Sequence, residues 1–158
     1  MKSIYSVLVF SVLAAGCANL VPGTSKESDV IAYFGQAAEQ RLLPDGSRVL
    51  DFPRAPMGYE NWRVTLGKDG VVRSVEQLLT EAHFARLKTG MSIDEVKRKL
   101  SRHAEISIYA NISEEVISWR YMEFNRRMFF NAHFDNAGRF KYASKSEEDI
   151  PQNESNQP

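Results

Sequence analysis

The chain has 158 residues, with 20 Lys and Arg against 20 Asp and Glu, and therefore no formal net charge at pH 7. This length suits one ordinary domain or two very small ones. The balanced charges argue against a nucleic-acid-binding protein, because such proteins need a concentrated basic surface.

The start of the chain has the pattern of an export signal. Lys2 precedes a mostly apolar run over residues 4–13, and small residues follow at 14–16, where a signal peptidase would cut. This run is much shorter than the roughly 20 apolar residues that a transmembrane helix needs. We therefore predict a signal peptide over residues 1–16 rather than a membrane span.

The only cysteine, Cys17, follows this segment directly. Leu13-Ala14-Ala15-Gly16-Cys17 resembles the lipobox of bacterial lipoproteins. The resemblance implies a diacylglycerol and palmitate on Cys17, a short anchor linker over residues 17–23, and, because no Asp follows the cysteine, an outer-membrane lipoprotein facing the periplasm. The alternative is an ordinary secretory signal with an incidental cysteine.

Residues 24–79 form the first predicted unit. Residues 24–27, Thr-Ser-Lys-Glu, are typical of a capping box, and Val30, Ile31 and Phe34 follow at helical spacing. A turn then precedes alternating apolar residues, which indicate strands. The predicted strands are residues 48–52, 62–66 and 71–79, with turns at 44–46 and 68–70.

Residues 80–143 form the second predicted unit. Thr80 is a candidate N-cap for a helix over residues 81–87, and Ser92 with Glu95 is a capping box for a second helix. Alternating apolar residues again indicate strands. These are residues 116–121, 128–134 and 139–143, with a turn at 136–138.

The two units repeat one order of elements. Val30 lies 66 residues before Val96, and Gly70 lies 68 residues before Gly138. We therefore predict an α+β fold of two tandem helix-then-three-strand units, with antiparallel sheet and helices packed on one face. The alternative is a chance recurrence of a common pattern. Residues 144–158 carry few large apolar side chains and are predicted to be a disordered tail.

The second unit carries a set of residues in a recognisable order: Phe84, Leu87, Gly90, Met91, Ser92, Val96, Leu100, Trp119, Tyr121, Phe134, Gly138 and Phe140. With these residues the unit resembles the BamE (SmpA/OmlA) family of lipoproteins of the outer-membrane β-barrel assembly machine. The resemblance implies a scaffold without cofactors, and its tandem form is similar to the two-copy β-lactamase inhibitor proteins. The family usually has Leu-Gly-x-Pro after its second helix, whereas this chain has Phe34-Gly35-Gln36-Ala37 and Leu100-Ser101-Arg102-His103.

No motif in the sequence indicates catalysis. The three histidines, His83, His103 and His133, are scattered without the i, i+4 pairing or cysteine neighbours typical of metal sites. Of the three, His133 is the stronger candidate for a functional role, because it shares a strand face with Phe129 and Asn131. We predict a protein that is not an enzyme and binds no metal.

Two segments suit partner binding. The first is a proline-stiffened connection that presents Arg54, Met57 and Tyr59, and the second joins two strands and presents Arg126 and Arg127. Arginine and tyrosine are common in interface hot spots. The alternatives are a plain strand connection for the first segment and a solvated hairpin turn for the second.

These patterns together predict a non-enzymatic envelope scaffold, anchored in membrane lipid through Cys17, with an envelope protein as its partner. The partner implied by the resemblance is the barrel-assembly machinery. A second hypothesis is an inhibitor or binding protein for an envelope enzyme. A cell-wall hydrolase or lipid-processing enzyme is the weakest hypothesis, because no nucleophile, base or metal cluster supports it.

Overall fold

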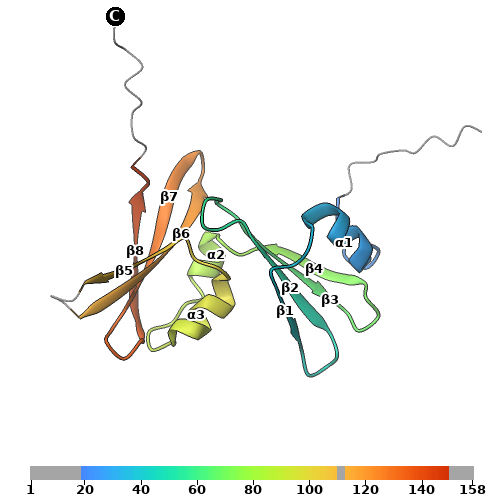
Figure 1. Cartoon of the computed structure of the whole chain (residues 1–158), viewed down its shortest axis with the longest axis horizontal. Coiled ribbons are helices and arrows are strands. Elements are labelled where there is room, and N and C mark those ends of the chain that lie inside the picture. Colours follow the sequence, from blue (N-terminus) through green and yellow to red (C-terminus); the bar gives the residue numbers. More distant parts are fainter. Residues whose placement is uncertain (1–18, 110–112, 150–158) are drawn as a thin grey trace, which may run out of the picture.

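The computed structural model describes residues 19–109 and 113–149, which form two antiparallel four-stranded sheets and three short helices (Figure 1). The strands follow chain order within each sheet. This confirms an α+β fold with antiparallel sheet. In chain order the elements are α1 (Glu27–Phe34), β1 (Glu39–Leu42), β2 (Arg48–Pro53), β3 (Asn61–Leu66), β4 (Val72–Gln77), α2 (Glu81–Phe84), α3 (Ile93–Leu100), β5 (Glu105–Tyr109), β6 (Glu114–Glu123), β7 (Arg126–Phe134) and β8 (Phe140–Glu147).

Each sheet has four strands, so the predicted number of three per unit was wrong. The missed strands are β1 and β5, which are the first strand of each sheet. The β1 sequence, Glu-Gln-Arg-Leu, has no β-branched residue, so only its pairing with β2 makes it a strand. The β5 sequence, Glu-Ile-Ser-Ile-Tyr, does alternate polar and apolar residues, and the prediction overlooked that signal.

Two other predicted boundaries also differ from the structure. Strand β8 continues to Glu147, so residues 144–147 pair with β7 and do not belong to a tail. Helix α2 ends at Phe84, earlier than predicted. The last residues of the predicted tail, 150–158, lie outside the described residues.

The first core lies between α1 and one face of the β1–β4 sheet. Val30 and Phe34 come from α1, and the Phe34 ring stacks on Phe52 with centroids 4.8 Å apart. Alternation along each strand sends every second side chain to this face. The buried residues of this core are Val30, Leu50, Phe52, Val64, Leu66 and Val72.

The second core is larger and more aromatic. Phe84 of α2 stacks on Phe130 with centroids 3.9 Å apart, and Val96 and Leu100 of α3 are fully buried against the same sheet. Leu79, placed by prediction at the end of the first unit, also packs in this second core. The buried sheet residues are Ile117, Trp119, Tyr121, Met128, Phe130, Ala132, Phe134 and Phe140.

Helices α1 and α3 begin in the same way. Ser92 accepts a hydrogen bond from the Glu95 amide while Glu95 accepts from the Ser92 amide, which confirms the predicted capping box. In α1 the N-cap is Lys26 rather than an earlier residue of 24–27. Each N-cap forms a bridge to a hairpin of the following sheet, Lys26 to Val71 before β4 and Ser92 to Arg139 before β8.

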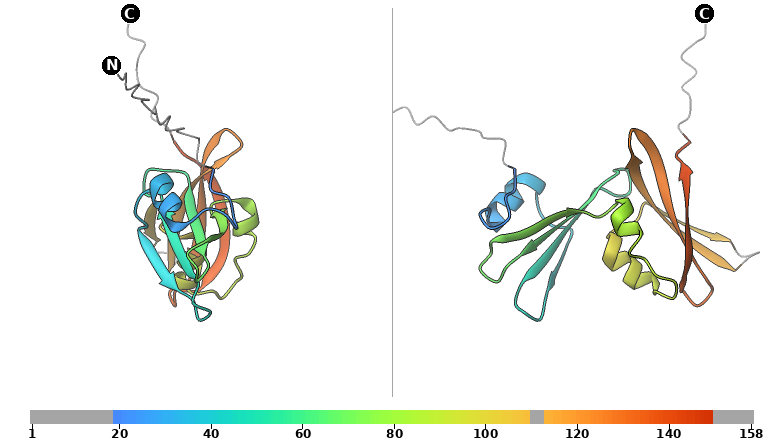
Figure 2. Two further views of the ribbon diagram at one scale, coloured as in Figure 1. Left: turned by 90° about the vertical axis from the view of Figure 1, so that its right-hand side faces the viewer. Right: turned by 180° about the vertical axis from the view of Figure 1, so that it is seen from behind.

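Helices α2 and α3 lie between the two sheets (Figure 1, Figure 2). The C-terminal end of α3 meets the face of the first sheet that does not carry the core. There Asn61, which is fully buried, donates hydrogen bonds of 2.8 Å from Nδ2 to the carbonyls of both Leu100 and Arg102. The first sheet therefore supplies donors that the end of a helix needs.

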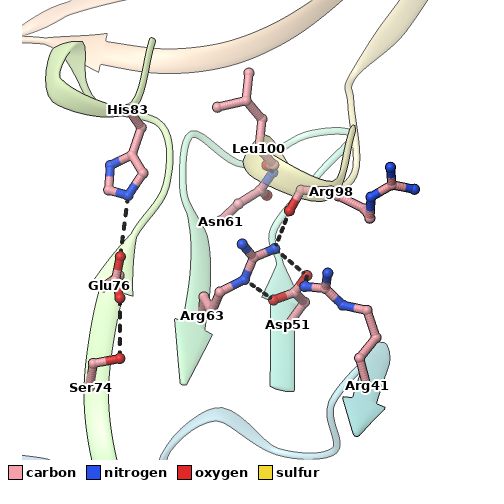
Figure 3. A network of polar contacts seen from close by, with 9 residues as sticks. All are labelled: Arg41, Asp51, Asn61, Arg63, Ser74, Glu76, His83, Arg98 and Leu100. Carbon is pink, nitrogen blue, oxygen red and sulfur yellow. Dashed lines mark hydrogen bonds and ion pairs between the residues drawn. The ribbon is translucent and has the colours of Figure 1, made fainter. Parts of the chain in front are cut away.

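We call the contact between the end of α3 and the first sheet the junction. Its second part is built around the buried carboxylate of Asp51 (Figure 3). Arg63 donates to Asp51 from Nε at 2.6 Å and from Nη2 at 2.7 Å, and the same Nη2 donates to the Arg98 carbonyl at 2.8 Å. Arg41 contacts Asp51 at 3.3 Å from the other side. The network fixes α3 and the attached second sheet relative to the first sheet.

Candidate functional site

The two predicted binding segments contact each other. The loop between β2 and β3 lies beside β6 and β7 (Figure 1). The Tyr59 hydroxyl donates a 2.7 Å hydrogen bond to Glu148, and the Arg127 guanidinium lies 5.8 Å from the centre of the Tyr59 ring. The bond to Glu148 raises the pKa of Tyr59. Much of the predicted binding surface is therefore used in contacts within the chain.

Arg120 of β6 holds this loop in place. Its Nη1 donates to the Pro56 carbonyl at 2.9 Å, and its Nε lies 2.9 Å from Glu148 in an ion pair that is not aligned as a hydrogen bond. The loop brings Gly58 so close to Arg54 that only glycine fits, because an added Cβ at residue 58 would stand 2.3 Å from the Arg54 Cβ. Met57 remains 73 % exposed at the tip of the loop.

The predicted arginine turn is part of a strand. Arg126 and Arg127 are the first residues of β7, and the connecting turn is Phe124-Asn125. Arg126 forms ion pairs with Glu123 at 2.8 Å and Glu147 at 3.1 Å. Surface ion pairs of this kind contribute little to stability, but they neutralise the charge of Arg126, one of the two arginines predicted to contact a partner.

A hollow lies on the face of the second sheet that no described helix covers. It has a volume of about 660 Å³ and crosses all four strands, β5 to β8. Because side chains alternate between faces, the same strands that bury the core present a second row of side chains here. We call this hollow the groove. The residues that line it include Ser107, Val116, Ser118, Arg120, Phe129, Asn131, His133, Tyr142, Ser144 and Ser146.

A ladder of hydrogen bonds orders the middle of the groove. Ser118 Oγ donates to Asn131 Oδ1 at 2.8 Å, and Asn131 Nδ2 donates to Ser146 Oγ at 3.1 Å. The ladder joins β6, β7 and β8 side by side. It holds donors and acceptors at fixed positions, which lowers the entropy lost when a ligand binds.

A cluster of charged and polar side chains around Glu114 and His133 lies in the groove. His133 Nδ1 lies 3.2 Å from Glu114 Oε2, His133 Nε2 lies 2.9 Å from Ser144 Oγ, and the His133 ring stacks on Tyr142 with centroids 4.3 Å apart. Lys141 donates to the other Glu114 oxygen. Its hydrogen bond, followed by that of His133, lowers the pKa of Glu114.

This cluster has the order Ser-His-Glu that activates a nucleophile in some hydrolases. Two features favour a structural role instead. Ser144 lies on a regular strand rather than a tight turn, and Lys141 already balances the Glu114 charge that would orient an imidazolium. The sequence did not reveal the cluster, because its members come from three strands that only the sheet brings together.

The other histidines stand apart from the groove. His83 contacts Glu76 at 3.3 Å near the junction (Figure 3), and His103 lies against Trp119, where burial lowers its pKa. Within residues 19–109 and 113–149 no three potential ligands converge on a metal position. Among the helices of the same ranges, none has the length and apolarity to cross a membrane. Cys17 lies outside the described residues.

Comparisons with known proteins give little further information. No family model matches the chain, and no curated protein matches it. Among solved structures, the chain is similar to a DUF4309 family protein (YjgB) from Bacillus subtilis, with 14 % sequence identity, 82 % of each chain covered and a TM-score of 0.32. A similarity this low bears on neither the site nor the function.

Proposed function

We propose that this protein is a lipid-anchored, periplasm-facing binding protein of the outer membrane, without enzymatic activity, whose partner protein docks in the groove. The groove is the observation that carries the proposal. It offers about 660 Å³ on a sheet face that the described helices leave open, while the opposite face of the same sheet is fully packed.

The composition of the groove supports a protein partner. Tyrosine, serine and asparagine dominate natural protein-binding loops, because tyrosine supplies contact area at low entropic cost and the small polar residues adapt their hydrogen bonds. Tyr142, which lines the groove, is 48 % exposed, and Asn131 and Ser118 line the same groove. Most groove charges are paired within the chain, so the partner need not carry a compensating charge.

Acylation of Cys17 would position the groove relative to the membrane. The described chain begins at Asn19 near α1, whereas the second sheet lies at the opposite end of the molecule (Figure 1, Figure 2). An anchor two residues before Asn19 would leave the groove far from the lipid surface. This arrangement suits a protein that meets partners in the periplasm.

The same proposal includes the tandem BamE-like organisation. It also includes a role in outer-membrane β-barrel assembly or envelope integrity. Equivalent bridges join Lys26 to Val71 and Ser92 to Arg139. Both sheets also have the same strand order. These recurrences support two copies of one helix-then-strand unit.

The alternative function is inhibition or binding of an envelope enzyme. Met57, exposed on a loop that Arg120 and Tyr59 hold in place, favours it. A rigid loop beside an open groove can enter an active site at little entropic cost.

Photo-crosslinking in intact envelopes tests the binding proposal. A crosslinking amino acid at Asn131 is expected to capture a partner protein, and the same group at Gln40, exposed on β1, is the matched control. Recovery of barrel-assembly components supports the scaffold, and recovery of one soluble enzyme supports the inhibitor. Equal capture from both positions, or Cys17 without acyl chains in mass spectrometry of the mature protein, would overturn the proposal.

The absence of enzymatic activity is tested at Ser144. We expect a fluorophosphonate probe, which labels activated serines, to label the wild-type protein no more than Ser144→Ala. Labelling that requires both Ser144 and His133 would show that the cluster is catalytic and would refute this part of the proposal.

A further inference from the structure

Strand β5 forms one end of the second sheet and pairs only with β6 among the described strands. One edge of β5 therefore has backbone amides and carbonyls that no described strand uses. Such an edge is a template for another extended chain unless the protein protects it.

The opposite edge of the sheet is protected. Strand β8 carries Lys141, Lys145 and Glu147, and Lys145 Nζ contacts Glu81 at 2.6 Å and Glu123 at 3.0 Å. Charged side chains of this kind discourage strand addition. Strand β5 has no lysine or proline and carries two isoleucines, so the two edges differ in whether they oppose pairing.

The isoleucines of β5 extend the buried face of the sheet into solvent. Ile106 lies opposite Ile117, which is fully buried, and Ile108 lies opposite Glu115. Yet Ile106 is 44 % exposed and Ile108 is 77 % exposed. A further strand beside β5 would cover both side chains and gain about 25 cal/mol for each Å² of apolar surface removed from water.

The other face of β5 is polar. Glu105, Ser107 and Tyr109 alternate with the isoleucines and line the groove. A strand added at this edge would therefore place alternate side chains in two environments. Residues on one side would meet Ile106 and Ile108, and residues on the other side would enter the groove.

A smaller hollow at the end of β5 adds a charge preference. It has a volume of about 260 Å³ and lies beside Ile108, with Glu115 and Asp135 in its wall. Glu114 also lines it but is already paired with Lys141. No basic side chain stands among the described lining residues, so a cation from a partner would be favoured there.

We propose that β5 accepts an extended segment of a partner protein as a fifth strand, in which apolar and polar residues alternate and a Lys or Arg reaches the acidic hollow at Ile108. The inference rests on the proposed function, because it identifies the kind of segment that the binding protein recognises. The backbone of the segment supplies affinity, and its alternation supplies specificity.

A defined peptide tests this inference on the full-length protein. The probe is a nine-residue synthetic peptide that alternates Val and Thr and ends in two Lys, and its control has the same composition with all Val together. We expect the alternating peptide to bind more tightly in fluorescence anisotropy. We also expect it to slow hydrogen exchange of β5 amides, while β8 amides stay unchanged.

A matched pair of variants locates the binding edge. Ile108→Lys places a cation beside the acidic hollow and on the apolar row, and we expect it to weaken peptide binding at least tenfold. Leu42→Lys is the control, since Leu42 is 74 % exposed on β1, the first strand of the other sheet, and we expect no change. Both sites are exposed, so both variants are expected to fold.

Three outcomes would overturn the inference. They are equal binding of both peptides, equal effects of both variants, and a wild-type dimer that Ile108→Lys dissociates, which would make a second copy the occupant of β5. If Ile108→Lys leaves capture of the partner at Asn131 intact and the peptide does not bind, the strand-addition inference fails while the proposed function stands.

Discussion

Helices α1 and α3 end with nearly the same backbone geometry but with different residues. Gly35 after α1 has φ 82° and ψ −157°, and Ser101 after α3 has φ 63° and ψ −155°. This region of backbone space is favourable essentially only for glycine. Tertiary contacts hold Ser101 there, because its carbonyl accepts from Trp119 and the neighbouring carbonyls accept from Asn61. A helix end can thus be fixed locally by glycine or at a distance by another sheet.

The sharpest test of this comparison removes the distant support. Asn61→Ala leaves the carbonyls of Leu100 and Arg102 without their donor, and we expect the free energy of unfolding to fall by about 3 kcal/mol, since buried groups without hydrogen bonds are costly. Urea denaturation measures this loss. Asn136→Ala, at an exposed turn, is the control and is expected to change stability by less than about 0.5 kcal/mol. Equal losses would show that Asn61 does not support the end of α3.

Asp51→Asn tests the ionic part of the same junction. Arg63 would lose a charge-assisted pair in which the Asp51 side chain is only 3 % exposed, and we expect a loss of about 2 kcal/mol in the free energy of unfolding. The pair is largely shielded from solvent, so the loss is expected to persist at high salt. A loss that disappears in 1 M salt, where the Debye length falls from about 8 Å at physiological ionic strength to about 3 Å, would mark the contact as a surface pair.

Exchanging the two helix-end residues sharpens the comparison directly. Ser101→Gly relieves the backbone strain and removes a buried hydroxyl that has no partner among the described residues, so we expect stability to rise by about 1 kcal/mol. Gly35→Ser introduces the same strain at α1, and we expect a fall of about 1 kcal/mol. Thermal and urea unfolding measure both changes. If both substitutions raised or both lowered the free energy of unfolding, the two helix ends would not be equivalent in backbone geometry.

The smallest expected effect concerns the pH dependence of the second sheet. The pKa of Glu114 is lowered in the folded protein, so its ionised form stabilises the fold above the unfolded glutamate value of about 4.3, and this contribution is lost as the pH falls through the folded pKa. We expect the Tm difference between the wild type and Glu114→Gln to be largest at neutral pH and to shrink below about pH 4.3. A Tm difference that grows in acid would contradict a stabilising role for ionised Glu114.

The fold was predictable from sequence where the signal is local. The capping box at Ser92 and the turns at Gly46, Gly70 and Gly138 depend on neighbouring residues, and all four glycine or serine signals mark real boundaries. The extent of β8 was not predictable in this way, because residues 144–147 carry polar side chains and become a strand only through pairing with β7.

The candidate site was less predictable than the fold. Arg54, Met57 and Tyr59 were predicted from residue type and from the prolines of their connection, and neither signal reveals that Tyr59 and Arg127 contact each other. The shared strand face of Phe129, Asn131 and His133 was the one useful signal, since that face is the groove. The cross-strand partners that complete the groove depend on register, which the alternation within one strand does not specify.

The hydrogen-bond donors of Asn61 and Arg63 also bear on how the chain unfolds. If the first sheet melts, the end of α3 loses its hydrogen bonds at Leu100, Arg102 and Arg98 at the same moment. The free energies of the two sheets are therefore coupled through one helix end. The predicted boundary at residues 79–80 divides the sequence into two patterns, but these shared hydrogen bonds lead us to expect that the molecule unfolds across it as a single cooperative unit.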